Sequence, residues 1–208
     1  MDEITETKWK VLNRDTIKYI AMFTMLLNHI SKIFMESGNF VSEVFLNVGY
    51  FTAIIMCYFL VEGYQYTHSK KKYAYRLIIY ALISEIPYCL AFTENGVLEF
   101  CGLNMLFTLF ICFCILFVVE RVKNTPLKVV SILILILLSL ASDWPLLAPI
   151  FTLLFIWGKD SKKKLKAAFV ISIILFGLFK FVGGIGRFPL NTNILYALGR
   201  IVGVTLAG

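Results

Sequence analysis

Eight long apolar stretches are the feature that most constrains how this chain folds. They alternate with short charged connections across the 208 residues. Because about 20 apolar residues in a helix cross a bilayer, the pattern predicts an all-α, polytopic membrane bundle with about eight transmembrane helices and almost no domain outside the lipid. The stretches cover residues 16–34, 44–64, 74–92, 105–119, 127–141, 145–157, 167–182 and 193–206.

The composition excludes several classes of protein. Hydrophobic residues make up 59% of the chain and charged residues 16%, against about 25% charged residues in an average soluble protein. A soluble enzyme, a secreted disulfide scaffold and a nucleic-acid-binding domain are therefore excluded. We expect one transmembrane domain over residues 1–208, with the lipid bilayer as a partner and no nucleic acid, although the net charge is +7.

The positive charges indicate how the chain is oriented. Fifteen of the 20 Lys and Arg residues lie in the N-terminal segment and in the second, fourth and sixth connections. The odd-numbered connections carry mostly acidic residues. Because Lys and Arg are retained on the cytoplasmic side, both termini are predicted to be cytoplasmic.

The first stretch holds polar residues that are costly in lipid. Lys18, Met22, Met25 and His29 are spaced as one helical stripe, and His29 lies about 16 Å beyond Lys18. A cation near the cytoplasmic face with an imidazole below it describes a polar channel. The alternative is structural, with Lys18 reaching the interface and His29 making one interhelical hydrogen bond. Histidine also suits proton transfer near neutral pH.

Other ionisable or polar residues fall within or beside later stretches. We expect an ion pair between Glu62 and Arg76, which serves structure or function. Glu85 lies deeper in its stretch, whereas Asn104 and Asp143 lie near the outer boundary, where they are helix caps or contact substrate. With one intramembrane histidine and no cysteine pair, no metal site is expected.

Four segments resemble the TraX family in the same order. Residues 15–30, DTIKYIAMFTMLLNHI, resemble its opening signature: an aspartate, a lysine three residues later, an Ala-Met pair and an Asp-His pair. The blocks 61–88, 103–109 and 142–144 are similar to its later elements, so the signature is strongest over residues 15–155. Position 28 departs from the pattern, since it is Asn where the family usually has Asp.

The resemblance implies acyl transfer. TraX-like proteins are linked to N-terminal acetylation of conjugative pilin. They look like distant relatives of membrane acyltransferase family three, which modifies surface glycans and has a basic residue and a histidine at the spacing of Lys18 and His29. The implied protein is a membrane acetyltransferase of the bacterial cytoplasmic membrane. Its donor is acetyl-CoA, and its acceptor is a peptide N-terminal amine or a glycan hydroxyl.

The same resemblance assigns roles to individual residues. His29 is the expected general base, and the amide of Asn28 orients its ring. Lys18 and Arg14 hold phosphate or pantetheine groups, and Glu85 or Asp143 fixes the imidazole tautomer or binds the acceptor. The full expected set for acyl-CoA and substrate is Arg14, Asp15, Lys18, Glu62, Arg76, Glu85, Asn104 and Asp143.

Two other functions remain open at this point. One is a small transporter in which Lys18, His29 and Glu85 relay protons or ions. The other is a non-catalytic membrane partner of a conjugation or secretion system, in which these residues are replaceable by apolar ones. Binding of acyl-CoA would distinguish the acetyltransferase from both of these alternatives.

Overall fold

The chain is helical throughout the part that the structure describes. The computed structural model describes residues 13–36, 38–93 and 101–205, and within them it contains no β-strand. The all-α prediction is confirmed for these residues. In chain order the helices are α1 (Arg14–Phe34), α2 (Phe40–Gly49), α3 (Phe51–Tyr66), α4 (Lys70–Phe92), α5 (Met105–Arg121), α6 (Thr125–Leu138) with the short 3-10 turn η1 (Ser139–Ala141), α7 (Leu147–Gly158), α8 (Lys162–Gly184) and α9 (Leu190–Thr205).

The helices follow the apolar stretches with one difference. The second stretch forms two helices, α2 and α3, which meet at Tyr50. Three segments are long and apolar enough to cross a membrane: Phe40–Tyr66, Lys70–Phe92 and Lys162–Gly184. The other helices are shorter or more polar, so eight membrane passes stay a prediction.

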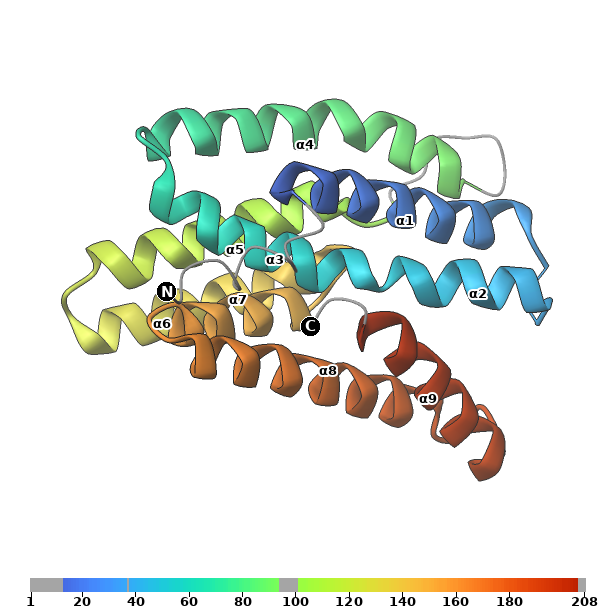
Figure 1. Ribbon diagram of the computed structural model, residues 1–208. Helices are drawn as coiled ribbons and strands as arrows, with labels where there is room; N and C mark the ends of the chain where they lie inside the picture. The colour runs from blue at the N-terminus through green and yellow to red at the C-terminus, as the bar shows by residue number, and fades with distance from the viewer. Residues whose placement is uncertain (1–12, 37, 94–100, 206–208) are drawn as a thin grey trace, which may run out of the picture.

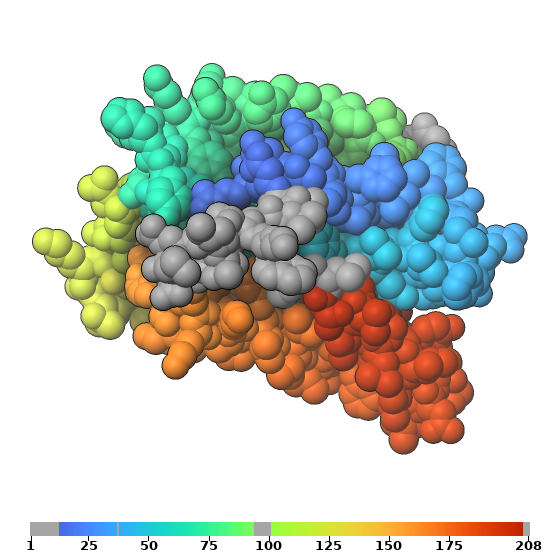
Figure 2. All heavy atoms as spheres, in the orientation of Figure 1, coloured from blue at the N-terminus to red at the C-terminus, as the bar shows by residue number. Residues whose placement is uncertain are grey.

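The helices run roughly along one axis (Figure 1). α3, α5 and α7 pack on one another at the centre, α4 packs on the outside of α5, and α8 and α9 pack beside α7 and α2. The space-filling view shows α4 along one edge and α9 along the opposite edge (Figure 2). The central core is filled by large side chains with less than 2% exposure, among them Ile54, Ile115, Phe151 and Phe155.

Lysine-rich connections gather at one end of this axis. In Figure 1, α4 and α8 begin at the left, where α5 ends. Lys70–Lys72 open α4 and Lys162–Lys164 open α8. We call this the lysine end and the opposite one the far end.

Buried hydroxyl groups join α1 to its neighbours in the bundle. The Thr52 hydroxyl on α3 donates to the Ala21 carbonyl at 2.7 Å and lies 2.9 Å from the Thr24 hydroxyl. Nearer the far end, the Ser31 hydroxyl donates to the Ser42 carbonyl on α2 at 2.8 Å. In an apolar medium such hydrogen bonds hold helices at a defined rotation, at roughly 0.6 kcal/mol each on average.

The middle of this polar seam is a close contact between α1 and α2. The Asn28 amide donates to the Leu46 carbonyl at 2.9 Å. Gly49 faces Asn28 so closely that a Cβ at position 49 would lie 2.2 Å from the Asn28 Cβ. Glycine is therefore required here for close approach, not for an unusual backbone angle.

Substitution of Gly49 by Ala is expected to destabilise the protein. The added methyl group overlaps the base of the Asn28 side chain, and overpacking of this kind costs about 1–3 kcal/mol. The check is thermal unfolding in detergent, with Gly183→Ala as the matched control. Gly183 also lies in a helix, but nothing lies within 4 Å of its added methyl group, so that variant should be unchanged or slightly more stable. Equal unfolding temperatures for Gly49→Ala and the wild type would contradict the packing.

Candidate functional site

The predicted stripe on α1 faces two cavities, one towards each end of the bundle. Lys18 and Met22 line a cavity at the lysine end, and Met25 and His29 line another at the far end. We call them the basic cavity and the histidine cavity. Every residue of the stripe therefore lines a cavity, but Lys18 and His29 line different ones.

The basic cavity has a volume of about 890 Å³ and lies between α1, α3 and α4. It exists because α4 packs on α5, whereas α1 packs on α2 and α3. Lys18 Nζ lies 3.3 Å from the Asp15 carboxylate. No carboxylate of the described residues lies within 4.0 Å of the other two cations that line it, Lys72 and Arg76. The cavity therefore carries a surplus of positive charge.

The expected pair of Glu62 with Arg76 is wrong. The Glu62 carboxylate instead lies 3.0 Å from the Arg14 guanidinium. Glu62 is on the side of α3 that meets the start of α1, while α4 packs mainly on α5. Arg76 is left facing the basic cavity, and Arg14 and Glu62 line neither cavity.

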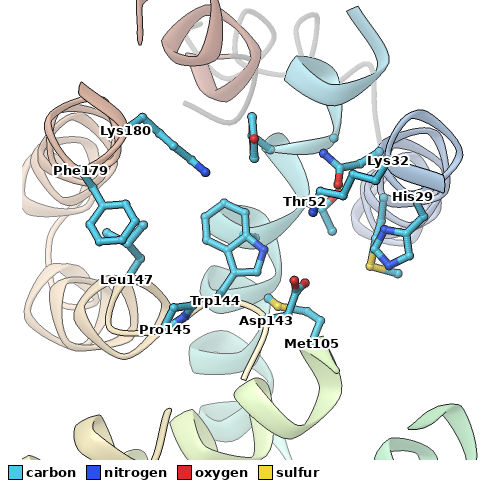
Figure 3. Close-up of a pocket in the computed structure, with 15 residues that line it drawn as sticks. His29, Lys32, Thr52, Met105, Asp143, Trp144, Pro145, Leu147, Phe179 and Lys180 are labelled. Atoms are coloured by element: carbon cyan, nitrogen blue, oxygen red, sulfur yellow. The ribbon is translucent and has the colours of Figure 1, made fainter. Parts of the chain in front are cut away.

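The histidine cavity has a volume of about 290 Å³ and is lined by α1, the junction of α2 and α3, α5, α8, the turn before α7 and the first residue of α7. In Figure 3 the Asp143 carboxylate points into the space between Trp144 and His29. Lys32 from α1 and Lys180 from α8 line the same cavity. Two cations, one carboxylate and one imidazole thus surround a single small space.

The His29 ring is held between the cavity and α4. It packs edge-on against Phe92, with ring centres 5.5 Å apart, and lies 6.1 Å from the Tyr88 ring. Its Nδ1 atom is buried and has no hydrogen-bond partner among the described residues. This nitrogen therefore keeps a hydrogen-bonding capacity that the described residues do not use.

The position of Asp143 is set by backbone contacts with the segment before α5. The Asp143 amide donates to the Leu103 carbonyl at 2.9 Å, and the Leu103 amide donates to the Ala141 carbonyl at 2.8 Å. Residues 142–146 form the connection between η1 and α7. Leu146 within it has a φ of 62°, a strained conformation for a residue with a side chain. Strained backbone of this kind is found at functional sites more often than elsewhere.

Glu85 and Asn104 form a structural contact. The Asn104 amide nitrogen Nδ2 donates to the Glu85 carboxylate at 2.7 Å, and its Oδ1 accepts from the Leu106 backbone amide at 2.9 Å. Asn104 thus caps α5, one of the two roles predicted for it. Neither residue lines the cavity that holds His29.

Asn28 lines the histidine cavity, but its amide is already used by the Leu46 carbonyl. The structure therefore gives it a role in holding α1 on α2. It makes no hydrogen bond with His29 among those that the structure shows for the described residues.

The two cavities follow one another along three helices. On α1, Met22 lines the basic cavity and Met25 the histidine cavity; on α3 the corresponding residues are Met56 and Ala53. On α5, Met105 lines the histidine cavity and Leu109, one turn later, lines the basic cavity. About one helical turn, or 5.4 Å, therefore separates their linings on each helix.

Two cations of the histidine cavity, Lys32 and Lys180, are not among the site residues predicted from the sequence. Both lie inside predicted apolar stretches, at 16–34 and 167–182. The criterion that selected Lys18, the cost of a charge in lipid, applies to them equally. Among the described residues, no three His, Cys, Asp or Glu side chains lie close enough together to hold a metal ion.

Comparison with known proteins identifies the family. The family model described as TraX protein matches residues 13–202. The chain belongs to the TraX family. It is 31% identical over 163 residues to a probable fimbrial assembly protein FimC, serogroup H1, from Dichelobacter nodosus. That match covers 75% of this chain and 66% of the relative, and no solved structure matches.

Replacing Asn28 with Asp is expected to destabilise this chain. The carboxylate lacks the N–H that donates to the Leu46 carbonyl, and a buried acceptor left without its donor costs about 1–3 kcal/mol. Thermal unfolding in detergent at neutral pH measures this loss. Asn39→Asp is the matched control, because Asn39 caps α2 through its side-chain oxygen and Asp caps equally well. A stable Asn28→Asp variant would show that the contact with Leu46 contributes nothing.

Proposed function

We propose that this TraX-family protein is a membrane-embedded acetyltransferase. It takes an acetyl group from acetyl-CoA and transfers it to a hydroxyl or amine of an acceptor. The observation that supports this most is the pair of cavities on one stripe of α1, with the cations of one cavity and the histidine of the other only a few helical turns apart. A two-substrate transfer needs two adjoining sites of this kind.

The basic cavity is the proposed donor site. CoA carries phosphate groups, and lysine and arginine are the side chains that bind phosphate most strongly. Lys72 and Arg76 are not neutralised by a carboxylate of the described residues, and Lys18 reaches the same space. The lysine end faces the cytoplasm in this proposal, where acetyl-CoA is found.

The histidine cavity is the proposed site of transfer. His29 accepts the proton of the acceptor hydroxyl as its oxygen attacks the thioester carbonyl carbon. The carbon–sulfur bond then breaks, and the CoA thiolate leaves and takes up the proton from His29. Transfer needs no redox partner, and atoms and charge balance.

Methionines line the junction that the thioester has to pass. Met22 and Met56 belong to the basic cavity, and Met25 and Met105 belong to the histidine cavity. Methionine is unbranched and adapts its shape readily. Methionine side chains over one helical turn can change rotamer to let the narrow pantetheine chain of the donor pass, at little cost in packing.

The protein is proposed to be a multi-pass protein of the bacterial cytoplasmic membrane, with eight passes and both termini in the cytoplasm. The three apolar helices and the lysine end support this orientation. Under it the histidine cavity lies near the outer face, so the acceptor is a peptide amine or glycan hydroxyl on that side.

The structure bears differently on the two alternative functions, a proton relay and a non-catalytic role in assembly. A proton relay through Lys18, His29 and Glu85 is less favoured, because the Glu85 carboxylate accepts hydrogen bonds from Asn104 and lines neither cavity. A non-catalytic role in assembling surface fibres is favoured by one observation, the name of the fimbrial assembly relative. Binding of acetyl-CoA decides between that role and transfer.

Removal of the imidazole is expected to abolish transfer without loss of donor binding. Purified His29→Ala should bind acetyl-CoA as the wild type does, while release of CoA in the presence of membrane extract falls by about 100-fold or more, the usual size of a general-base contribution. Full activity in this variant would rule out the assigned base.

Loss of a cation from the basic cavity should weaken donor binding. Arg76→Met is expected to bind acetyl-CoA about tenfold more weakly, the loss of one charge-assisted hydrogen bond. The control is Arg121→Met, because Arg121 is also at the lysine end but lines a different cavity. Equal affinities for the two variants, or no binding of acetyl-CoA to folded wild-type protein, would contradict the proposed donor site.

The proposed orientation is tested with single cysteines. In a variant without the five native cysteines, an impermeant maleimide added to intact cells should label Arg187→Cys, at the exposed turn between α8 and α9. Lys163→Cys, at the exposed start of α8, should be labelled only after the cells are opened. The reverse result would place the lysine end outside.

A further inference from the structure

We propose that the histidine cavity binds an anionic sugar residue and that Lys180 is the residue that selects it. The inference rests on the proposed function, because it names the class of acceptor that the same cavity takes. It concerns the choice between a glycan hydroxyl and a peptide amine, which the resemblance to the TraX family leaves open.

Lys180 is positioned inside the cavity without a direct ion pair among the described residues. Its Nζ atom lies 4.7 Å from the centre of the Tyr50 ring and 5.5 Å from that of Phe176. No carboxylate of the described residues lies within 4.0 Å of it. In Figure 3 its side chain extends from α8 towards Trp144, into the lined space. The aromatic rings hold the cation in place, and they leave its N–H donors free for a ligand.

The charges around the cavity favour an anion over an ammonium group. Lys32 and Lys180 supply two positive charges, and Asp143 is the one carboxylate among the described residues that line it. A protonated peptide N-terminus entering this space meets two like charges at close range, which is unfavourable in a medium of low dielectric constant. A carboxylate or phosphate is instead attracted to Lys32 and Lys180, with an energy similar in size to that repulsion.

The remaining lining residues fit a sugar ring. The cavity volume of about 290 Å³ is at the lower end for small-molecule sites, so one sugar residue fits better than a longer segment. Trp144 lines the cavity and is stacked on Phe176, with ring centres 5.6 Å apart and planes at 23°. An aromatic face fixed in this way packs against the apolar face of a sugar ring while the anionic group reaches Lys180.

The arrangement also places the reacting groups. With the anion at Lys180 on α8, the opposite side of the ring is directed towards α1, where His29 lies (Figure 3). A neutral hydroxyl at that side gives its proton to His29 and takes the acetyl group. Lys180 therefore acts as a specificity residue, and O-acetylation is the corresponding reaction class.

The test is equilibrium dialysis of radiolabelled D-glucuronate against the purified full-length protein in neutral detergent, without acetyl-CoA. D-Glucose, D-glucosamine and trialanine amide, a peptide with a free amine and no carboxylate, serve as competitors. We expect glucuronate to bind about tenfold or more tightly than glucose, the gain from one charge-assisted hydrogen bond, and the difference to shrink as salt is added. Glucosamine and trialanine amide should compete more weakly than glucose.

Three variants assign the preference to Lys180. Lys180→Met should remove it, and Lys180→Arg should keep it because the charge is retained. Lys164→Met is the matched control, since Lys164 also lies over an aromatic ring, 5.8 Å from the centre of the Trp157 ring, but lines no part of this cavity. All variants are first shown to unfold within a few degrees of the wild type.

The results that would overturn the proposal are equal binding of glucose and glucuronate, tighter binding of glucosamine or trialanine amide, no binding of any sugar to the folded protein, or a preference that survives in Lys180→Met. Because acetyl-CoA is absent, these outcomes are separate from those for acyl transfer. A protein that prefers glucuronate but never binds acetyl-CoA refutes the transferase and leaves the anionic sugar site standing.

Discussion

The hydrogen-bonded seam between α1 and the α2–α3 pair determines where the reactive groups lie. Apolar surfaces give little preference for one helix rotation over another in lipid, because lipid tails are as apolar as the side chains. Thr24, Asn28 and Ser31 supply that preference by bonding to groups on α2 and α3. These three residues are spaced by four and three positions, so they form one face of α1.

The face next to this seam carries the residues of the proposed site. Met25 and His29 directly follow Thr24 and Asn28 in the sequence, and each is rotated from its seam neighbour by about 100°. Met22 likewise follows Ala21, whose carbonyl accepts from Thr52. Once the seam is docked, the stripe has to face the space beside α3. That space stays open because α4 packs on α5 and leaves α1 uncovered along part of its length. The rotation of α1 about its axis thus sets both its packing on α2 and α3 and the direction in which the stripe faces.

The two cavities differ in charge, and the proposed function assigns each a different ligand. The basic cavity has cations without carboxylate partners at the lysine end, which suits a polyanionic donor. The smaller histidine cavity combines a base, two cations and a carboxylate that the Leu103 backbone holds in position. In the proposed reaction, two separate cavities keep the donor phosphates one helical turn or more away from His29.

The amino-acid sequence by itself determined the helical class, nearly all of the helices, the stripe on α1 and, through its family motifs, membership of the TraX family. These follow from local periodicity and composition, which need no knowledge of which helices are neighbours. The tertiary structure alone decided the partners. It paired Glu62 with Arg14 and Glu85 with Asn104, and it brought Lys180 from a distant helix to the cavity of His29. Such contacts depend on how each helix is rotated and on which helix packs beside it, and the spacing of residues along one segment does not carry that information.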